Sequence, residues 1–83
     1  MSFTMVRITG ISHIGDRISC VVFVEDCKEP IHATLSVADG SMENDVLPSG
    51  YEWCVSHLHH AQNALMKMMQ QGEFPESKTI MWY

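Results

Sequence analysis

Four residues near the middle of the chain are of types that bind metals or act as nucleophiles. They follow one another at short spacing: Cys54, His57, His59 and His60. Thiolate and imidazole groups suit zinc or copper, and a step of three residues places side chains on one helical surface. Cys54 with His57, or His57 with His60, could therefore share a metal ion. All four cannot converge, because Cys54 points toward the expected core and His59 toward the flank opposite His57.

A structural metal site would need further ligands from elsewhere in the chain. The other cysteines and histidines are Cys20, Cys27, His13 and His32. None of them shows the close paired spacing of known zinc motifs. We therefore expect no metal and no cofactor, with Cys54 in the core as a small hydrophobe and its three neighbouring histidines on wetted helix surface. A metal- or thiol-based binder or sensor that uses Cys54, His57 and His60 is the alternative hypothesis.

The same residues allow a nucleophile to be considered. An imidazole one turn away could take the proton of the Cys54 thiol, but catalysis also requires a group that orients the imidazole and a site for an oxyanion. The sequence indicates neither. It also lacks the glycine-rich loops that bind nucleotide phosphates. We therefore predict no catalytic residues.

Length and composition predict one folded domain spanning residues 1–83. The chain is 46% hydrophobic and 18% charged, which is typical of a globular protein rather than a disordered one. Its net charge of −5 repels a phosphate backbone, and its five basic residues are scattered singly. Nucleic acid is therefore not an expected partner.

The expected compartment is the cytoplasm. No run approaches the roughly 18 apolar residues of a membrane span, so no membrane association is expected. The first residues lack the basic and apolar regions of a signal peptide. The odd number of cysteines, three, favours free thiols in a reducing compartment over a disulfide framework.

Four segments are predicted to be β-strands. Residues 3–11 and 78–83 are rich in branched and aromatic side chains. Residues 17–25 are apolar on both sides, which is typical of a central strand. Residues 31–37 alternate between apolar and polar side chains, so one side of this strand is expected to face water.

One long helix is predicted between the last two strands, after a loop at residues 39–48. Ser49 and Glu52 match a capping box, which predicts that the helix begins there. Apolar residues then recur at three- and four-residue steps until Gly72, a residue type that ends helices. Roughly 21 residues at about 1.5 Å each would span ~32 Å, enough to cross a small sheet.

The predicted elements combine into a two-layer α+β sandwich of order βββαβ. Short hairpins place the first three strands side by side. A helix that runs antiparallel to the third strand would make the last strand parallel to the first, beside which it lies. We therefore predict a four-stranded, mostly antiparallel sheet of order 3-2-1-4, with one long helix on one face.

The prediction for function follows from apolar surface that one helix cannot cover. Some apolar side chains of the sheet point away from the helix, and others lie at the edge of its apolar arc. The candidate interaction surface is Val21, Phe23, Trp53, His57 and Trp82. We therefore predict a small non-catalytic protein-interaction or accessory domain that acts through self-association, as a homodimer, or through a protein partner.

Overall fold

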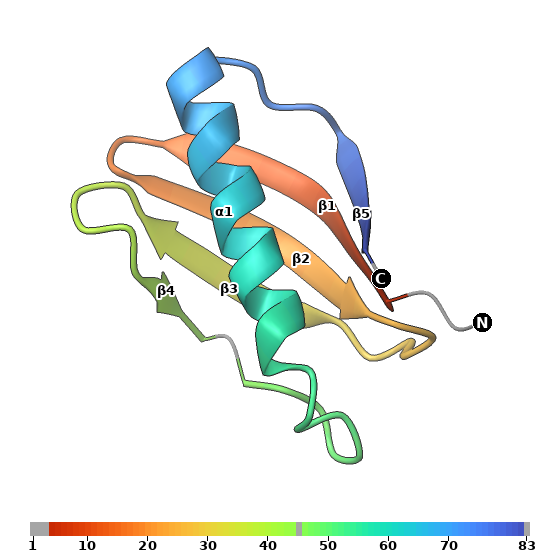
Figure 1. Cartoon of the computed structure of the whole chain (residues 1–83). Coiled ribbons are helices and arrows are strands. Elements are labelled where there is room, and N and C mark those ends of the chain that lie inside the picture. The colour runs from red at the N-terminus through yellow and green to blue at the C-terminus, as the bar shows by residue number, and fades with distance from the viewer. Residues whose placement is uncertain (1–3, 45, 83) are drawn as a thin grey trace.

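The fold is a five-stranded sheet with one helix packed against it (Figure 1). The computed structural model describes residues 4–44 and 46–82, with side chains as far as residue 81. In chain order its elements are β1 (Thr4–Ile14), β2 (Arg17–Val24), β3 (Ile31–Ser36), β4 (Met42–Glu43), α1 (Val55–Gln71) and β5 (Ser77–Trp82). The predicted α+β class and the single helix on one face are confirmed.

The sheet has the order β4-β3-β2-β1-β5, and every neighbouring pair is antiparallel. The predicted order of the four longer strands is therefore confirmed, with β4 added at one edge. The prediction that the last strand runs parallel to the first is wrong. The two-residue strand β4 lies inside the predicted loop and reverses the chain once more before α1, so β5 returns antiparallel to β1.

The core fills the space between the sheet and α1. Alternate side chains of the three central strands point to this side, because successive residues of a strand face opposite ways. The buried apolar residues of these strands are Val6, Ile8, Ile18, Cys20, Val22, Val24, Ile31, Ala33 and Leu35. Those of α1 and the residue before it are Cys54, Leu58, Ala61, Leu65 and Met68. The clean alternation of β3 and the branched or apolar composition of β1 and β2 explain why these three strands could be located from sequence.

The helix begins later than predicted. Its first residue is Val55, and Cys54 at the N-cap position makes no side-chain capping bond. The Glu52 carboxylate accepts a hydrogen bond from the Gly50 amide instead of the Ser49 amide, at 3.0 Å. Gly50 has a φ of +89°, which a right-handed helix does not allow. The capping-box prediction is therefore wrong, and residues 49–54 form turns.

The end of α1 agrees with the prediction. Gly72 has a φ of +73°, and its amide donates to the carbonyl of Met68 at 2.8 Å. A residue in this left-handed conformation satisfies a carbonyl that the last helical turn leaves open. No helix among residues 4–44 and 46–82 has the length and apolar character needed to cross a membrane.

One helix covers only part of the sheet. α1 packs mainly on β1 and β2. On the β3 side, partly buried residues from the following segment complete the core, namely Val37, Met42, Leu47 and Tyr51. Figure 1 shows α1 crossing the central strands while β5 lies beyond it at the sheet edge. The helix-facing side of β5 is therefore the least covered part of this layer.

We expect removal of residues 78–83 to unfold the chain or make it aggregate. β5 pairs with β1 over six residue positions, and its loss would turn β1 into an open edge. A domain of this length has only about 4 to 12 kcal/mol of stability to lose. Circular dichroism melting and light scattering on the full and shortened chains measure the effect. A shortened chain that stays monomeric and melts cooperatively would contradict the expectation.

Candidate functional site

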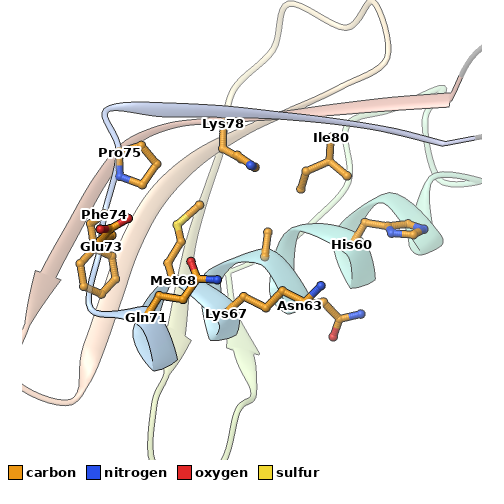
Figure 2. Close-up of a pocket in the computed structure, with 11 residues that line it drawn as sticks. His60, Asn63, Lys67, Met68, Gln71, Glu73, Phe74, Pro75, Lys78 and Ile80 are labelled. Carbon is orange, nitrogen blue, oxygen red and sulfur yellow. The ribbon is translucent and has the colours of Figure 1, made fainter.

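A groove runs between α1 and β5, on the side of the sheet that the helix occupies. Lys78 and Ile80 of β5 are paired with Ile8 and Val6 of β1, so they point to the helix side of the sheet. α1 does not extend over them, and a cavity of about 740 Å³ remains. Its volume lies within the ~300 to 1,000 Å³ that is typical of ligand sites. Figure 2 shows the groove with α1 as one wall and the β5 strand as the other.

The lining of the groove is a mixture of apolar and polar residues. The apolar residues come from α1, from the segment that follows it and from β5: Ala64, Met68, Phe74, Pro75 and Ile80. The polar and charged lining residues are His60, Asn63, Lys67, Gln71, Glu73 and Lys78. Five apolar and six polar or charged residues thus line the groove, so a ligand would meet apolar contacts and polar groups together.

The charge of the groove differs from that of the rest of the chain. Lys67 and Lys78 line it against one acid, Glu73, whereas the remaining sequence holds three bases against nine acids. In Figure 2 the two lysines stand on opposite walls, one on α1 and one on β5. The groove is therefore the place where an anionic group on a ligand would find positive charge.

The outer edge of β5 adjoins this groove. β5 is the last strand of the sheet, and within the described part of the chain no strand pairs with its outer edge. Lys78 on the helix side is exposed, and on the opposite side Thr79 is exposed and Met81 is 59% exposed. An unpaired strand edge presents amide and carbonyl groups that can bind another chain. β5 is thus open along its edge and on its helix-facing side.

The helix-free side of the sheet carries two of the predicted interaction residues. Val21 and Phe23 alternate with the buried residues of β2, as predicted, and both are partly exposed. Val21 pairs with His32 of β3, and the Arg7 guanidinium lies 4.9 Å from the centre of the Phe23 ring. Polar groups therefore flank both side chains. The side chain of the predicted residue Trp82 lies outside the described residues.

His57 is buried, so the prediction that it lies on wetted helix surface is wrong. It is 1% exposed, and its Nε2 atom lies 2.7 Å from Oε1 of Glu25. Glu25 follows β2 with a φ of +50°, a conformation that non-glycine residues seldom adopt. This backbone conformation lets the Glu25 side chain reach the helix side of the sheet. The buried imidazole thus gains a polar partner that the helical pattern alone does not indicate.

Aromatic residues cover this pair at the start of α1. The Trp53 ring meets the His57 imidazole edge-on, with 5.5 Å between ring centres, while Trp53 itself is 61% exposed. Tyr51 stacks beside Trp53 at 6.5 Å and donates its hydroxyl proton to Asp26 at 2.9 Å. This hydrogen bond raises the pKa of the Tyr51 phenol. The arrangement connects the segment before α1 to the end of β2.

The proposed metal or thiol site is not assembled. Cys54 is fully buried, and burial, followed by the charge of Glu25, raises the pKa of its thiol. The raised pKa favours the neutral thiol, which is a poor nucleophile and metal ligand. His57 lies against Glu25, whereas His60 lines the groove. Among the residues that the structure describes, no group of three or more His, Cys, Asp or Glu side chains could hold a metal ion.

Sequence reasoning missed Glu25 and the groove residues. Glu25 is 32 positions from His57, and no local pattern connects them. The sequence did contain a signal for the groove. Lys78 and Ile80 are two positions apart in the predicted last strand, so their side chains point to the same side of the sheet. That the helix would stop short of this side could not be read from the alternation.

Replacement of Glu25 by alanine is expected to lower the free energy of unfolding by about 1 to 3 kcal/mol, because the buried imidazole loses a polar partner. Alanine, like glutamate, has a Cβ atom, so a positive φ is about equally unfavourable for both residues. The change therefore isolates the effect of the carboxylate. Urea unfolding of the variant and the parent chain measures the difference. Glu29→Ala, at an exposed position of the same turn, is the control and should change stability by less than about 0.5 kcal/mol. Equal stability of Glu25→Ala and Glu29→Ala would exclude a stabilising role for the pair.

The three cysteines should differ in reactivity and in their effect on pH stability. Burial raises the pKa of the Cys20 thiol from its ordinary 9.0 to about 11. Iodoacetamide should therefore modify the partly exposed Cys27 first, as mass spectrometry of the native chain can show.

Because the folded pKa of Cys20 is raised, its contribution to stability is complete below pH 9 and is lost as the pH rises toward 11. The fall in the free energy of unfolding between pH 9 and pH 11 should be smaller for Cys20→Ala than for the parent chain, as urea unfolding at each pH can show. An identical fall in both chains would contradict the raised pKa of Cys20.

Comparison with family models, with curated proteins and with solved structures found no match for this chain. What the chain does is therefore inferred from the geometry of its own residues.

Proposed function

We propose that the chain is a small, non-catalytic protein-interaction domain of the cytoplasm, and that it binds a protein partner at the groove between α1 and β5. The partner is either a second copy of the chain or another protein. The observation that carries the proposal is that β5 is open in two directions at once, along its outer edge and toward the groove. One bound segment could cover both.

The energetics of an exposed strand support this location. An uncovered edge with an apolar cavity beside it is a liability for a protein that works alone, because it invites aggregation. A partner in the groove would remove from water the partly exposed apolar side chains of Ala64, Phe74 and Ile80, and each square ångström of apolar area buried contributes about 25 cal/mol. Binding at this site therefore uses surface that the fold itself leaves unshielded.

The state of the cysteines supports the non-catalytic and cytoplasmic parts of the proposal. Cys54 has no exposed surface, and its raised pKa keeps the thiol protonated beside a histidine that is itself buried. Such a pair lacks the access that a nucleophile requires. All three cysteines are free, and Cys27 is partly exposed, as suits a reducing compartment.

Filling the groove tests the proposal. Ala64 is half-buried in the groove wall, and Ala64→Trp should obstruct the cavity without removing a core side chain. Gln70→Trp places the same residue at an exposed position of the same helix, away from the groove. Affinity capture from an extract of the native host, together with light scattering for self-association, compares the two variants with the parent chain.

We expect a partner to be retained by the parent chain and by Gln70→Trp, and its retention to fall about ten-fold with Ala64→Trp, which corresponds to roughly 1.4 kcal/mol of lost affinity. Thermal melting verifies that both variants are folded. If a folded Ala64→Trp retains the partner or the self-associated state as well as Gln70→Trp does, the groove is not the binding site.

A further inference from the structure

We infer that the segment bound at the groove is an extended, acidic stretch of another protein, which adds to the sheet as a strand beside β5 and directs carboxylates toward Lys67 and Lys78. This inference rests on the proposed function and specifies the chemistry of its partner. It depends on three features of the described residues: the free strand edge, the apolar lining beside it and the two lysines on facing walls.

The free edge of β5 favours an extended segment over a helix. β5 has six residues and pairs on one side with β1. A chain added to the other side would form main-chain hydrogen bonds with amide and carbonyl groups that otherwise meet water. A helix in the groove would leave these groups without protein partners. Strand addition is therefore the binding mode that uses both the edge and the groove.

The groove then receives every second side chain of the added strand. Alternate residues of a strand point to the same side of a sheet, as Lys78 and Ile80 of β5 do. Side chains from the added strand that face α1 would meet Met68 and Phe74, which line the groove together with Ile80. Apolar residues on this side of the partner strand therefore have an apolar surface to contact.

The lysines determine the charge of the partner. Lys67 on α1 and Lys78 on β5 face the groove from its two walls, and Glu73 is the one acid in its lining. A carboxylate placed between the walls would be attracted to both ammonium groups, whereas a basic segment would be repelled. The β5 strand of a second copy carries Lys78 and no acid. Pairing of two copies through β5 would therefore add positive charge where negative charge is favoured.

Selection from a library of random twelve-residue peptides displayed on phage tests the inference. The parent chain is the bait, and selected peptides are then synthesised and titrated by fluorescence anisotropy. The variants are Lys67→Glu and Lys78→Glu, with Lys28→Glu as the matched control, because Lys28 is exposed and lies outside the groove. Amide chemical shifts of β5 report whether the strand edge is the contact.

We expect the selected peptides to be enriched in aspartate and glutamate among apolar residues, and to bind about ten-fold more weakly to each groove variant than to the parent chain or to Lys28→Glu. Higher salt should weaken binding. Peptides with proline at alternate positions should lose affinity, since proline cannot donate to a strand. Shifts of the β5 amides on binding complete the expected result.

The inference is overturned if no peptide is selected, if the peptides show no excess of acids, if they bind as helices, or if the lysine variants bind them as Lys28→Glu does. The outcome for the proposed function is separate. If any of these results is found but Ala64→Trp still loses the native partner, the groove remains a protein-binding site, and its occupant is not an extended acidic segment. Retention of the native partner with Ala64→Trp would reject the site itself.

Discussion

The structure depends on how much of a sheet one helix can shelter. Five strands spaced about 4.8 Å apart place the outer strands roughly 19 Å from one another, whereas a helix with its side chains is about 10 Å across. α1 takes the middle of this width, over β1 and β2, and partly buried residues from segment 37–51 fill the β3 side. Neither α1 nor this segment covers the β5 side of the sheet. Apolar residues next to the helix line the groove on this side, whereas on the opposite side of the sheet the Arg7 guanidinium lies over Phe23.

Much of this fold could be predicted from the sequence, because the central strands carry their orientation in their alternation of side chains. The apolar residues of β2 on the side opposite Val21 and Phe23 are all buried, and Gly72 ends the helix as its residue type indicates. The errors arose where the same residues could make equivalent hydrogen bonds in two different local structures. Glu52 could accept from an amide at the start of a helix, yet it accepts from Gly50 in a turn. β4 has two residues and no periodic signal, and missing it reversed the predicted direction of β5.

The site was less predictable than the fold, because its partners are distant in sequence. Cys54 was correctly placed in the core from its position on the helix. The polar partner of the buried His57 is Glu25, a non-glycine residue with a φ of +50°. No pattern of residue types indicates such a conformation. The lysines of the groove follow from alternation and helical spacing once the width of the covering layer is known, which is a property of the assembled layers and not of any segment.

Polar contacts away from β5 hold α1 and the turn before it in place over the sheet. The His57–Glu25 pair and the Tyr51–Asp26 hydrogen bond connect α1 and the turn before it to the end of β2, and the Gln62 amide donates to the Gly40 carbonyl near β4. A shift of α1 toward β5 would shelter Ile80, but it would break these polar contacts and uncover the β3 side of the core. Of these groups only the His57 imidazole is fully buried, and the loss of its polar partner would cost about 1 to 3 kcal/mol, which opposes such a shift of the helix. The contacts around His57 therefore hold α1 over β1 and β2, and this position of the helix leaves the groove beside β5 uncovered.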